Sequence, residues 1–309
     1  MKPLTFLPLL FLFACNTVQD QPDTVMPAKP PVPGHFAGGL DDYWYQGTAE
    51  INTYELQQAR YGELHPGTAS VIFVSEDFLT DKQVKNDNYS NPNSTPIIKT
   101  NLFRRFVTGI YDYSVMSSVF TPTKTDEQPH TLKVTTSMQD WCGQSFTQLN
   151  YDGGGEWNAQ LRSYFEAEAD QNLSIGADFL EDELFNRIRS GWQDLPTGEF
   201  RLIPSTAYLL MMHKPYADHP ATLSLGDYAG DDFSGENLKS YRVAYTGLSR
   251  TLNIVFDAAP PYVIRGWTET VSSRGKELTS VATLTHQVQT PYWSQNSVGD
   301  QPRREELGL

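Results

Sequence analysis

Hydrophobic and polar side chains alternate along much of this chain, most clearly within residues 131–168. Most alternate positions are apolar in TLKVTTSM (131–138) and again in WNAQLRSYF (157–165). A period of two places one set of side chains on a buried face and the other on a wetter face. The Asp-Gly-Gly-Gly run at 152–155 is suited to a turn, because glycine reaches positive φ at little cost. We therefore predict three antiparallel strands, with Cys142 on the middle one.

Similar short patterns continue on both sides of this region. Residues 70–74 (SVIFV) are apolar on both faces, which is typical of a central strand. Further strand patterns cover residues 49–60, 97–107, 110–120, 199–203, 206–213, 222–227, 240–245, 251–256, 262–270 and 278–288. Repeated short strands with turn signals between them indicate a mainly β protein, built on a curved antiparallel sheet or half-barrel.

One amphipathic helix is predicted near residues 175–190. Leu180, Leu184 and Ile188 repeat at four residues, and Gly191 follows as a helix stop. Acidic residues gather early and basic residues late, as the helix dipole favours. They are Asp178, Glu181, Asp182, Glu183, Arg187 and Arg189. We expect the acidic cluster to be a solvated face of this helix.

The N-terminus has the features of a bacterial lipoprotein. Lys2 precedes an apolar run of about ten residues, too short for a membrane span of about 20 residues. The run ends in Leu-Phe-Ala-Cys, which resembles the lipobox, so Cys15 is the expected lipidation site and residues 1–14 the signal peptide. The alternative is an ordinary cleaved signal with a chance cysteine. Two or more acyl chains are needed for stable anchoring.

The rest of the chain divides into three parts. Residues 15–34 are polar and rich in proline, which predicts an extended tether after the lipidated cysteine. Residues 35–290 carry the strand patterns and are expected to form a single β-rich domain. Residues 291–309 lack such a pattern, and we predict a disordered tail.

The charge of the chain bears on its partners. The formal net charge is -14, so the chain would repel nucleic acid and anionic membrane surfaces. The only adjacent basic pairs are Arg104-Arg105 and Arg303-Arg304, and neither makes a basic patch. We therefore expect no nucleic-acid partner.

Cys142 is the one cysteine left once Cys15 is acylated. A catalytic thiol needs a nearby histidine, and His213, His219 or His286 could supply one. No cysteine-hydrolase signature surrounds Cys142, however, and a cysteine within a strand is more often a small buried hydrophobe. We favour the buried thiol over the catalytic one.

Other candidate chemistry is sparse. Acidic residues near glycines resemble a calcium loop without EF-hand spacing, and a solvated turn is favoured. They are Asp227, Asp231, Asp232 and Glu236. The histidines show no zinc-ligand spacing, and no phosphate-binding or nucleophile-elbow motif occurs, so no metal or cofactor is predicted. Aromatic residues at 43–45 and 111–113 could stack on sugars or line an apolar groove, although core packing is commoner.

Several blocks resemble a family of uncharacterised lipoproteins from Gram-negative bacteria. They are YWYQGTAEINTYELQQARYGE (43–63), GIYDYSVMSSVFTP (109–122), KVTTSMQDWCGQSFTQLN (133–150), SYFEAEADQN (163–172) and LPTGEFRLIPS (195–205). Members are often labelled septum formation inhibitor Maf. Genuine Maf proteins are cytosolic nucleoside-triphosphate pyrophosphatases with an N-terminal Ser-Pro-Arg-Arg motif on an α/β fold. The only Pro-Arg-Arg here is at 302–304, so none of their functional residues is carried over.

These observations lead us to expect a non-enzymatic, lipid-anchored protein of the cell envelope. We expect it at the outer membrane, although Asn16 and Thr17 do not decide between the two membranes. Its expected role is to bind or carry an apolar or envelope-derived ligand, with a glycan as a further possibility. One alternative is a thiol-dependent hydrolase or transferase using Cys142. A weaker alternative is the nucleotide pyrophosphatase that the family label implies.

The anchoring hypothesis predicts the behaviour of one variant. Cys15→Ser should abolish acylation and leave an unprocessed precursor, because only that thiol is placed to take the lipid. Metabolic labelling with a fatty acid tests this, and label retained in the variant would rule out the lipobox.

Overall fold

A computed structural model describes residues 40–125 and 127–309 of the chain. The predicted signal peptide, the lipidation site Cys15 and the Pro-rich tether lie outside these residues.

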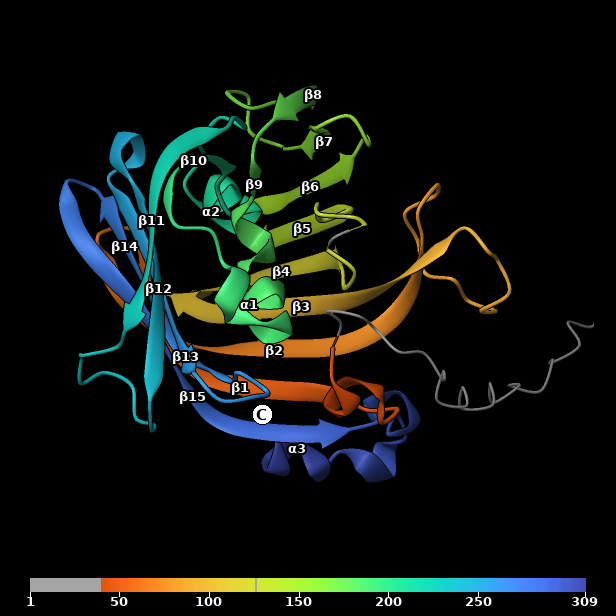
Figure 1. Cartoon of the computed structure of the whole chain (residues 1–309). Coiled ribbons are helices and arrows are strands. Elements are labelled where there is room, and N and C mark those ends of the chain that lie inside the picture. The colour runs from red at the N-terminus through yellow and green to blue at the C-terminus, as the bar shows by residue number, and fades with distance from the viewer. Residues whose placement is uncertain (1–39, 126) are drawn as a thin grey trace, which may run out of the picture. The chain divides into compact units, whose positions relative to one another are not determined.

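The fold is built on one sheet of fifteen strands in the order β8-β7-β6-β5-β4-β3-β2-β1-β15-β14-β13-β12-β11-β10-β9 (Figure 1). The strands are β1 Ala49–Arg60, β2 Glu63–Leu79, β3 Ser94–Thr108, β4 Tyr111–Pro122, β5 Lys133–Asp140, β6 Gly143–Tyr151, β7 Glu156–Arg162, β8 Gln171–Gly176, β9 Phe179–Leu180, β10 Gly198–Ile203, β11 His219–Asp227, β12 Leu238–Tyr245, β13 Arg250–Asp257, β14 Ile264–Ser273 and β15 Lys276–Thr290. Neighbours pair antiparallel, except β9 and β10, which are parallel. The sequence-based prediction of a mainly β protein with a curved antiparallel sheet is confirmed.

The sheet is open rather than closed into a barrel. Strands β8 and β9 follow each other along the chain, yet they stand at opposite ends of the strand order. Both are short, with six and two residues. Short edge strands expose few unpaired backbone groups to other chains.

The alternation that predicts the central strands matches their observed burial. Every second side chain of β5 and β7 is buried. Between β6 and β7 the Asp152 carboxylate accepts the backbone N–H of Gly154 at 2.6 Å and of Glu156 at 3.1 Å, which fixes the predicted turn.

The predicted helix at 175–190 is correct only in its second half. Helix α1 spans Leu184–Ser190, preceded by the 3-10 helix η2 at Glu181–Glu183, and it ends at Gly191 with φ of 146°. The preceding residues belong to β8 and β9 instead, because Phe179–Leu180 pairs with β10. The stripe of Leu180, Leu184 and Ile188 is buried.

The strand predicted at 206–213 is wrong. Residues Thr206–Met211 form helix α2, and all six of its side chains are buried. A short apolar run that is buried on every side has no polar face to reveal its period, so a helix and a strand look alike in the sequence.

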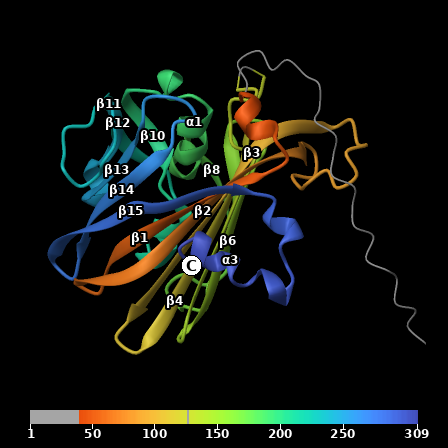
Figure 2. The ribbon, with the colours of Figure 1, turned by 90° about the horizontal axis from the view of Figure 1, so that it is seen from below.

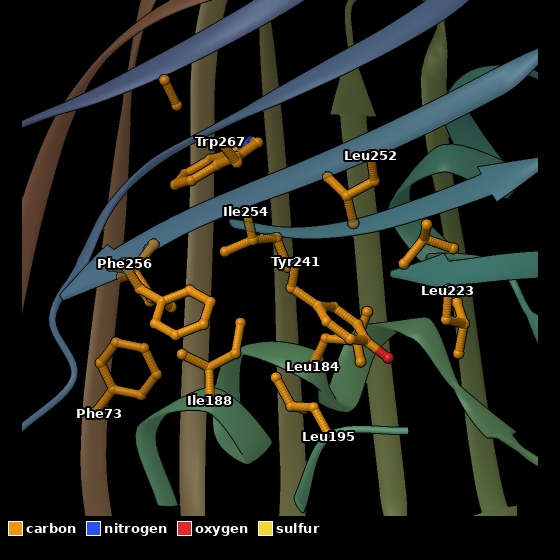
Figure 3. Close-up of a cluster of buried hydrophobic side chains, with 14 of the residues drawn as sticks. Phe73, Leu184, Ile188, Leu195, Leu223, Tyr241, Leu252, Ile254, Phe256 and Trp267 are labelled. Carbon is orange, nitrogen blue, oxygen red and sulfur yellow. The ribbon is translucent and has the colours of Figure 1, made fainter. Parts of the chain in front are cut away.

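Helices α1 and α2 fill the inside of the bend in the sheet (Figures 1 and 2). Helix α1 packs on β3 and β4, and α2 on β4 and β5. Figure 3 shows Leu184, Ile188 and Leu195 facing Phe73 of β2 and a group of side chains from the other half of the sheet. These are Tyr241, Ile254, Phe256 and Trp267. The inner face of the sheet is therefore a packed core.

Four buried charged side chains connect the inner segment to three strands. Arg250 of β13 donates from Nη2 to Glu181 of η2 at 2.6 Å and from Nε to Glu269 of β14 at 2.8 Å. Arg104 of β3 lies 3.5 Å from the same Glu269. Burial alone would raise the pKa of Glu269, but the charges of Arg250 and Arg104 outweigh it and lower that pKa.

A second buried pair joins α1 to β1. Arg189 binds the Glu50 carboxylate with both terminal nitrogens, at 2.6 Å for Nη2. The expectation of a solvated acidic face is therefore wrong for Glu181 and Glu183, which are buried. The acidic residues match the helix dipole, but Glu181 also faces inward, where Arg250 of β13 neutralises it.

Residues 291–309 were predicted to be disordered, whereas the structure places short helices there. They are η5 Tyr292–Ser294, η6 Val298–Asp300 and α3 Arg303–Glu306. Ser297 and Asp300 form a capping box that starts η6. Helix α3 lies on the side of β1 and β15 opposite α1 (Figures 1 and 2). The segment therefore covers part of the outer face of the sheet.

The buried ion pairs predict a stability effect. Glu269→Gln should lower the free energy of unfolding by about 3–5 kcal/mol, because Arg250 and Arg104 lose a buried counter-charge. The lowered pKa of Glu269 means that its stabilisation is complete above the ordinary carboxyl pKa of about 4.3 and is lost as the pH falls through the folded value. Urea unfolding between neutral and acidic pH tests this.

The matched control is Glu166→Gln, because Glu166 is exposed. It should change the free energy of unfolding by less than about 0.5 kcal/mol. An equally small change for Glu269→Gln would contradict a stabilising role of the buried pairs.

Candidate functional site

The strongest candidate site is a groove on the outer face of β1, β2 and β3. The pairing of the strands sets its floor, because side chains directly opposite each other share a face. Ile51 stands opposite Ile72, Ser70 opposite Phe103, and Thr68 opposite Arg105. All six residues line the groove.

The C-terminal segment forms the other wall of this groove. Tyr292, Arg304, Leu307 and Leu309 face the strands across a volume of about 230 Å³. The segment lies close to β15 as well, because a Cβ on Gly308 would approach Nδ1 of His286 within 2.3 Å. Gly308 also has a φ of 68°, a backbone conformation that favours glycine. The groove is therefore formed by residues far apart in the sequence.

The groove contains two arginines, one from each wall. Arg105 and Arg304 form no ion pair with any residue in the ranges that the structure describes. The guanidinium of Arg105 lies 5.8 Å from the ring centre of Phe103. Arg104, its neighbour in β3, points inward to Glu269. Alternation along the strand thus gives one arginine to the core and one to the groove.

A second groove, of about 520 Å³, lies on the outer face of β12 to β15. Its lining is polar: Ser240, Arg242, Thr251, Asn253, Thr268, Thr270 and Glu277. Hydroxyl and amide groups can bond to a sugar, but no aromatic side chain lines this groove to stack on one. The aromatic residues proposed from the sequence lie elsewhere, with Trp44 and Tyr113 buried in the core.

Cys142 lies in the turn between β5 and β6, and it is exposed. The prediction of a buried cysteine on the middle strand is wrong on both points. The strand pattern is interrupted because Asp140 accepts the backbone N–H of Cys142 at 2.6 Å and of Gly143 at 3.2 Å, which closes a tight turn. Alternation does not reveal such a turn.

The candidate histidines do not contact Cys142 in the described part of the chain. Nδ1 of His213 lies 2.7 Å from Glu168, and its ring packs on Phe165. His219 begins β11, and His286 lies on β15 beside the C-terminal segment. The structure therefore brings together a histidine and a carboxylate, but not the thiol and a base.

The acidic run lies at the end of β11 and in the loop before β12. Asp227, Asp231, Asp232 and Glu236 are exposed. Within the described ranges, no three acidic, histidine or cysteine side chains gather where they could hold a metal ion. No helix among those residues is long and apolar enough to cross a membrane.

One feature of the sequence is consistent with this groove. Residues 70–74 are apolar on both faces, and Ile72 points outward, where a strand of an open sheet normally meets water. An outward isoleucine indicates a covering segment. The sequence does not show which segment covers Ile72, because the last residues of the chain have no strand pattern that would place them.

Comparison with known proteins gives one architectural likeness. No protein-family profile matches the chain, and no curated protein matches it by sequence. A crystal structure of a β-barrel-like protein of the domain of unknown function DUF1849, from Brucella abortus, is similar to this chain with a TM-score of 0.48 and 9% identity. The match covers 78% of this chain and 97% of that chain.

The position of Cys142 predicts its reactivity. In the Cys15→Ser protein, where Cys142 is the only thiol, a maleimide should react without denaturation because the thiol is exposed. Cys142→Ala should change the free energy of unfolding by less than about 0.5 kcal/mol. Labelling only after denaturation would contradict the exposed position. Labelling far faster than in the unfolded chain would support the thiol-dependent alternative.

Proposed function

We propose that this is a lipid-anchored cell-envelope protein that binds an apolar, envelope-derived ligand and catalyses no reaction. The observation that carries the proposal is the outer groove, where Ile51, Ile72 and Phe103 face Leu307 and Leu309. Grooves that take small ligands are mostly apolar with a few polar groups, and this groove has that composition.

The filled interior supports a site on the outer face. A half-barrel carrier would hold an apolar ligand inside the bend, but α1 and α2 occupy that space. Leu184 and Ile188 are completely buried there (Figure 3). A ligand inside the bend would have to displace a close-packed core and its buried ion pairs, whereas the outer groove is open to solvent.

The expected anchor supports the same role. A lipidated Cys15 would hold the groove near a membrane, which is the source of envelope-derived apolar molecules. The polar, Pro-rich composition of residues 15–34 is typical of a tether between such an anchor and a folded domain. The likeness of the sequence blocks to Gram-negative lipoproteins agrees with an outer-membrane location.

Binding of a neutral apolar fluorophore, phenylnaphthylamine, to the full-length Cys15→Ser protein tests the proposal. Ile72→Asp should weaken binding about tenfold or more, because a carboxylate would then lie in the apolar part of the groove. Ile110→Asp is the matched control, since Ile110 is 82% exposed in the turn after β3 and lies outside the groove.

All variants retain the apolar leader, so any binding of the fluorophore to the leader is the same in each and does not affect the comparison between variants. Leu309→Asp changes the other wall of the groove without altering a strand, and it should weaken binding as Ile72→Asp does. Thermal unfolding identifies a variant that fails to fold. Unchanged binding in both groove variants would refute the proposed site.

A further inference from the structure

We propose that the ligand of the outer groove is a single-chain anionic amphiphile, with its acidic head group bound by Arg105 and Arg304. This inference rests on the proposed function and names the class of ligand. It depends on three properties of the groove: the order of its residues along the strands, the unpaired charge, and the size.

Polarity changes steadily along the floor of the groove. The first row pairs Ile51 with Ile72, and the last row pairs Thr68 with Arg105. Between them, Ser70 stands opposite Phe103. The two outer rows are four residues apart along β2, or about 13 Å. A ligand that matches this floor is apolar at one end and polar at the other.

Arg105 gives the polar end a positive charge, and it forms no ion pair within the described residues. The nearest acid on the same face is Asp112 of β4, which stands opposite Val107 and so lies diagonally from Arg105, and it does not line the groove. Glu55 of β1 lies two strands away from Arg105, at about 10 Å. Glu305 and Glu306 are exposed on α3 and do not line the groove.

Arginine suits an acidic head group on chemical grounds. Its planar guanidinium binds a carboxylate or phosphate with two parallel hydrogen bonds. The two arginines come from opposite walls, one from β3 and one from the C-terminal segment. A head group between them would therefore join the two walls.

The size of the groove limits the rest of the ligand. Its volume of about 230 Å³ is below the range of about 300–1,000 Å³ that is common for drug-sized ligands. One acyl chain of moderate length fits such a space, and a lipid with several chains exceeds it.

Competition for the bound phenylnaphthylamine tests this inference on the full-length Cys15→Ser protein. The competitors share one chain and differ in charge: dodecanoate, dodecyl phosphate, dodecanol and dodecyltrimethylammonium, all kept below their micelle-forming concentrations. Either anion should displace the probe at a concentration about tenfold lower than dodecanol, as a charged hydrogen bond implies. The two anions distinguish a fatty-acid head group from a phosphate.

Arg105→Gln and Arg304→Gln should each reduce the preference for anions over dodecanol several-fold, because each removes one charged partner of the head group. Arg242→Gln is the matched control, because Arg242 is an exposed arginine on the other outer groove. Added salt should also reduce the preference.

The outcomes separate this inference from the proposed function. Equal displacement by dodecanol and the anions, or stronger displacement by the cation, would overturn the anionic class while leaving an apolar site. An anion preference that survives in both arginine variants would overturn the assigned residues. Absence of probe binding would refute the proposed function itself.

Discussion

The structure depends on buried arginines that hold an inner segment against a bent sheet. Arg250 stands between Glu181, which precedes α1, and Glu269 of β14. Burying such charges is costly, and only well-placed partners offset the cost. Here each guanidinium meets carboxylates with several hydrogen bonds, so the position of α1 is fixed relative to strands from both halves of the sheet. Arg189 and Glu50 do the same for the end of α1 and β1.

This inner arrangement determines where function can lie. Because α1 and α2 fill the bend, the sheet differs from a hollow half-barrel, and the two grooves described above lie on its outer face. The two faces are linked through alternation along β3. Arg104 points inward and stabilises the core, whereas Arg105 points outward into the groove. One dipeptide thus contributes to both the fold and the candidate site.

Sequence patterns predicted most of the sheet because alternation is a local property. The predicted strand at 49–60 coincides with β1, and the turn at 152–155 is observed. Secondary structure was predicted wrongly where the local pattern fits a helix and a strand equally well, or where tertiary contacts outweigh the local pattern. Helix α2 has no exposed face, the first half of the predicted helix pairs as β9, and a single aspartate turns the chain at Cys142. The groove was not predictable because it requires strand register and the position of the last residues.

In the proposed mode of binding, the C-terminal segment couples ligand binding to its own position against the sheet. Leu307 and Leu309 complete the groove from one side, and Gly308 fits closely against His286. An amphiphile between the walls would contact β1, β2 and β3 on one side and the segment on the other, so it would favour the docked arrangement. By the same linkage, a variant that detaches the segment must weaken binding, even where it leaves the strands unchanged. In the proposed site, affinity would therefore depend on both walls, and Arg304 would help to join them as well as supply charge.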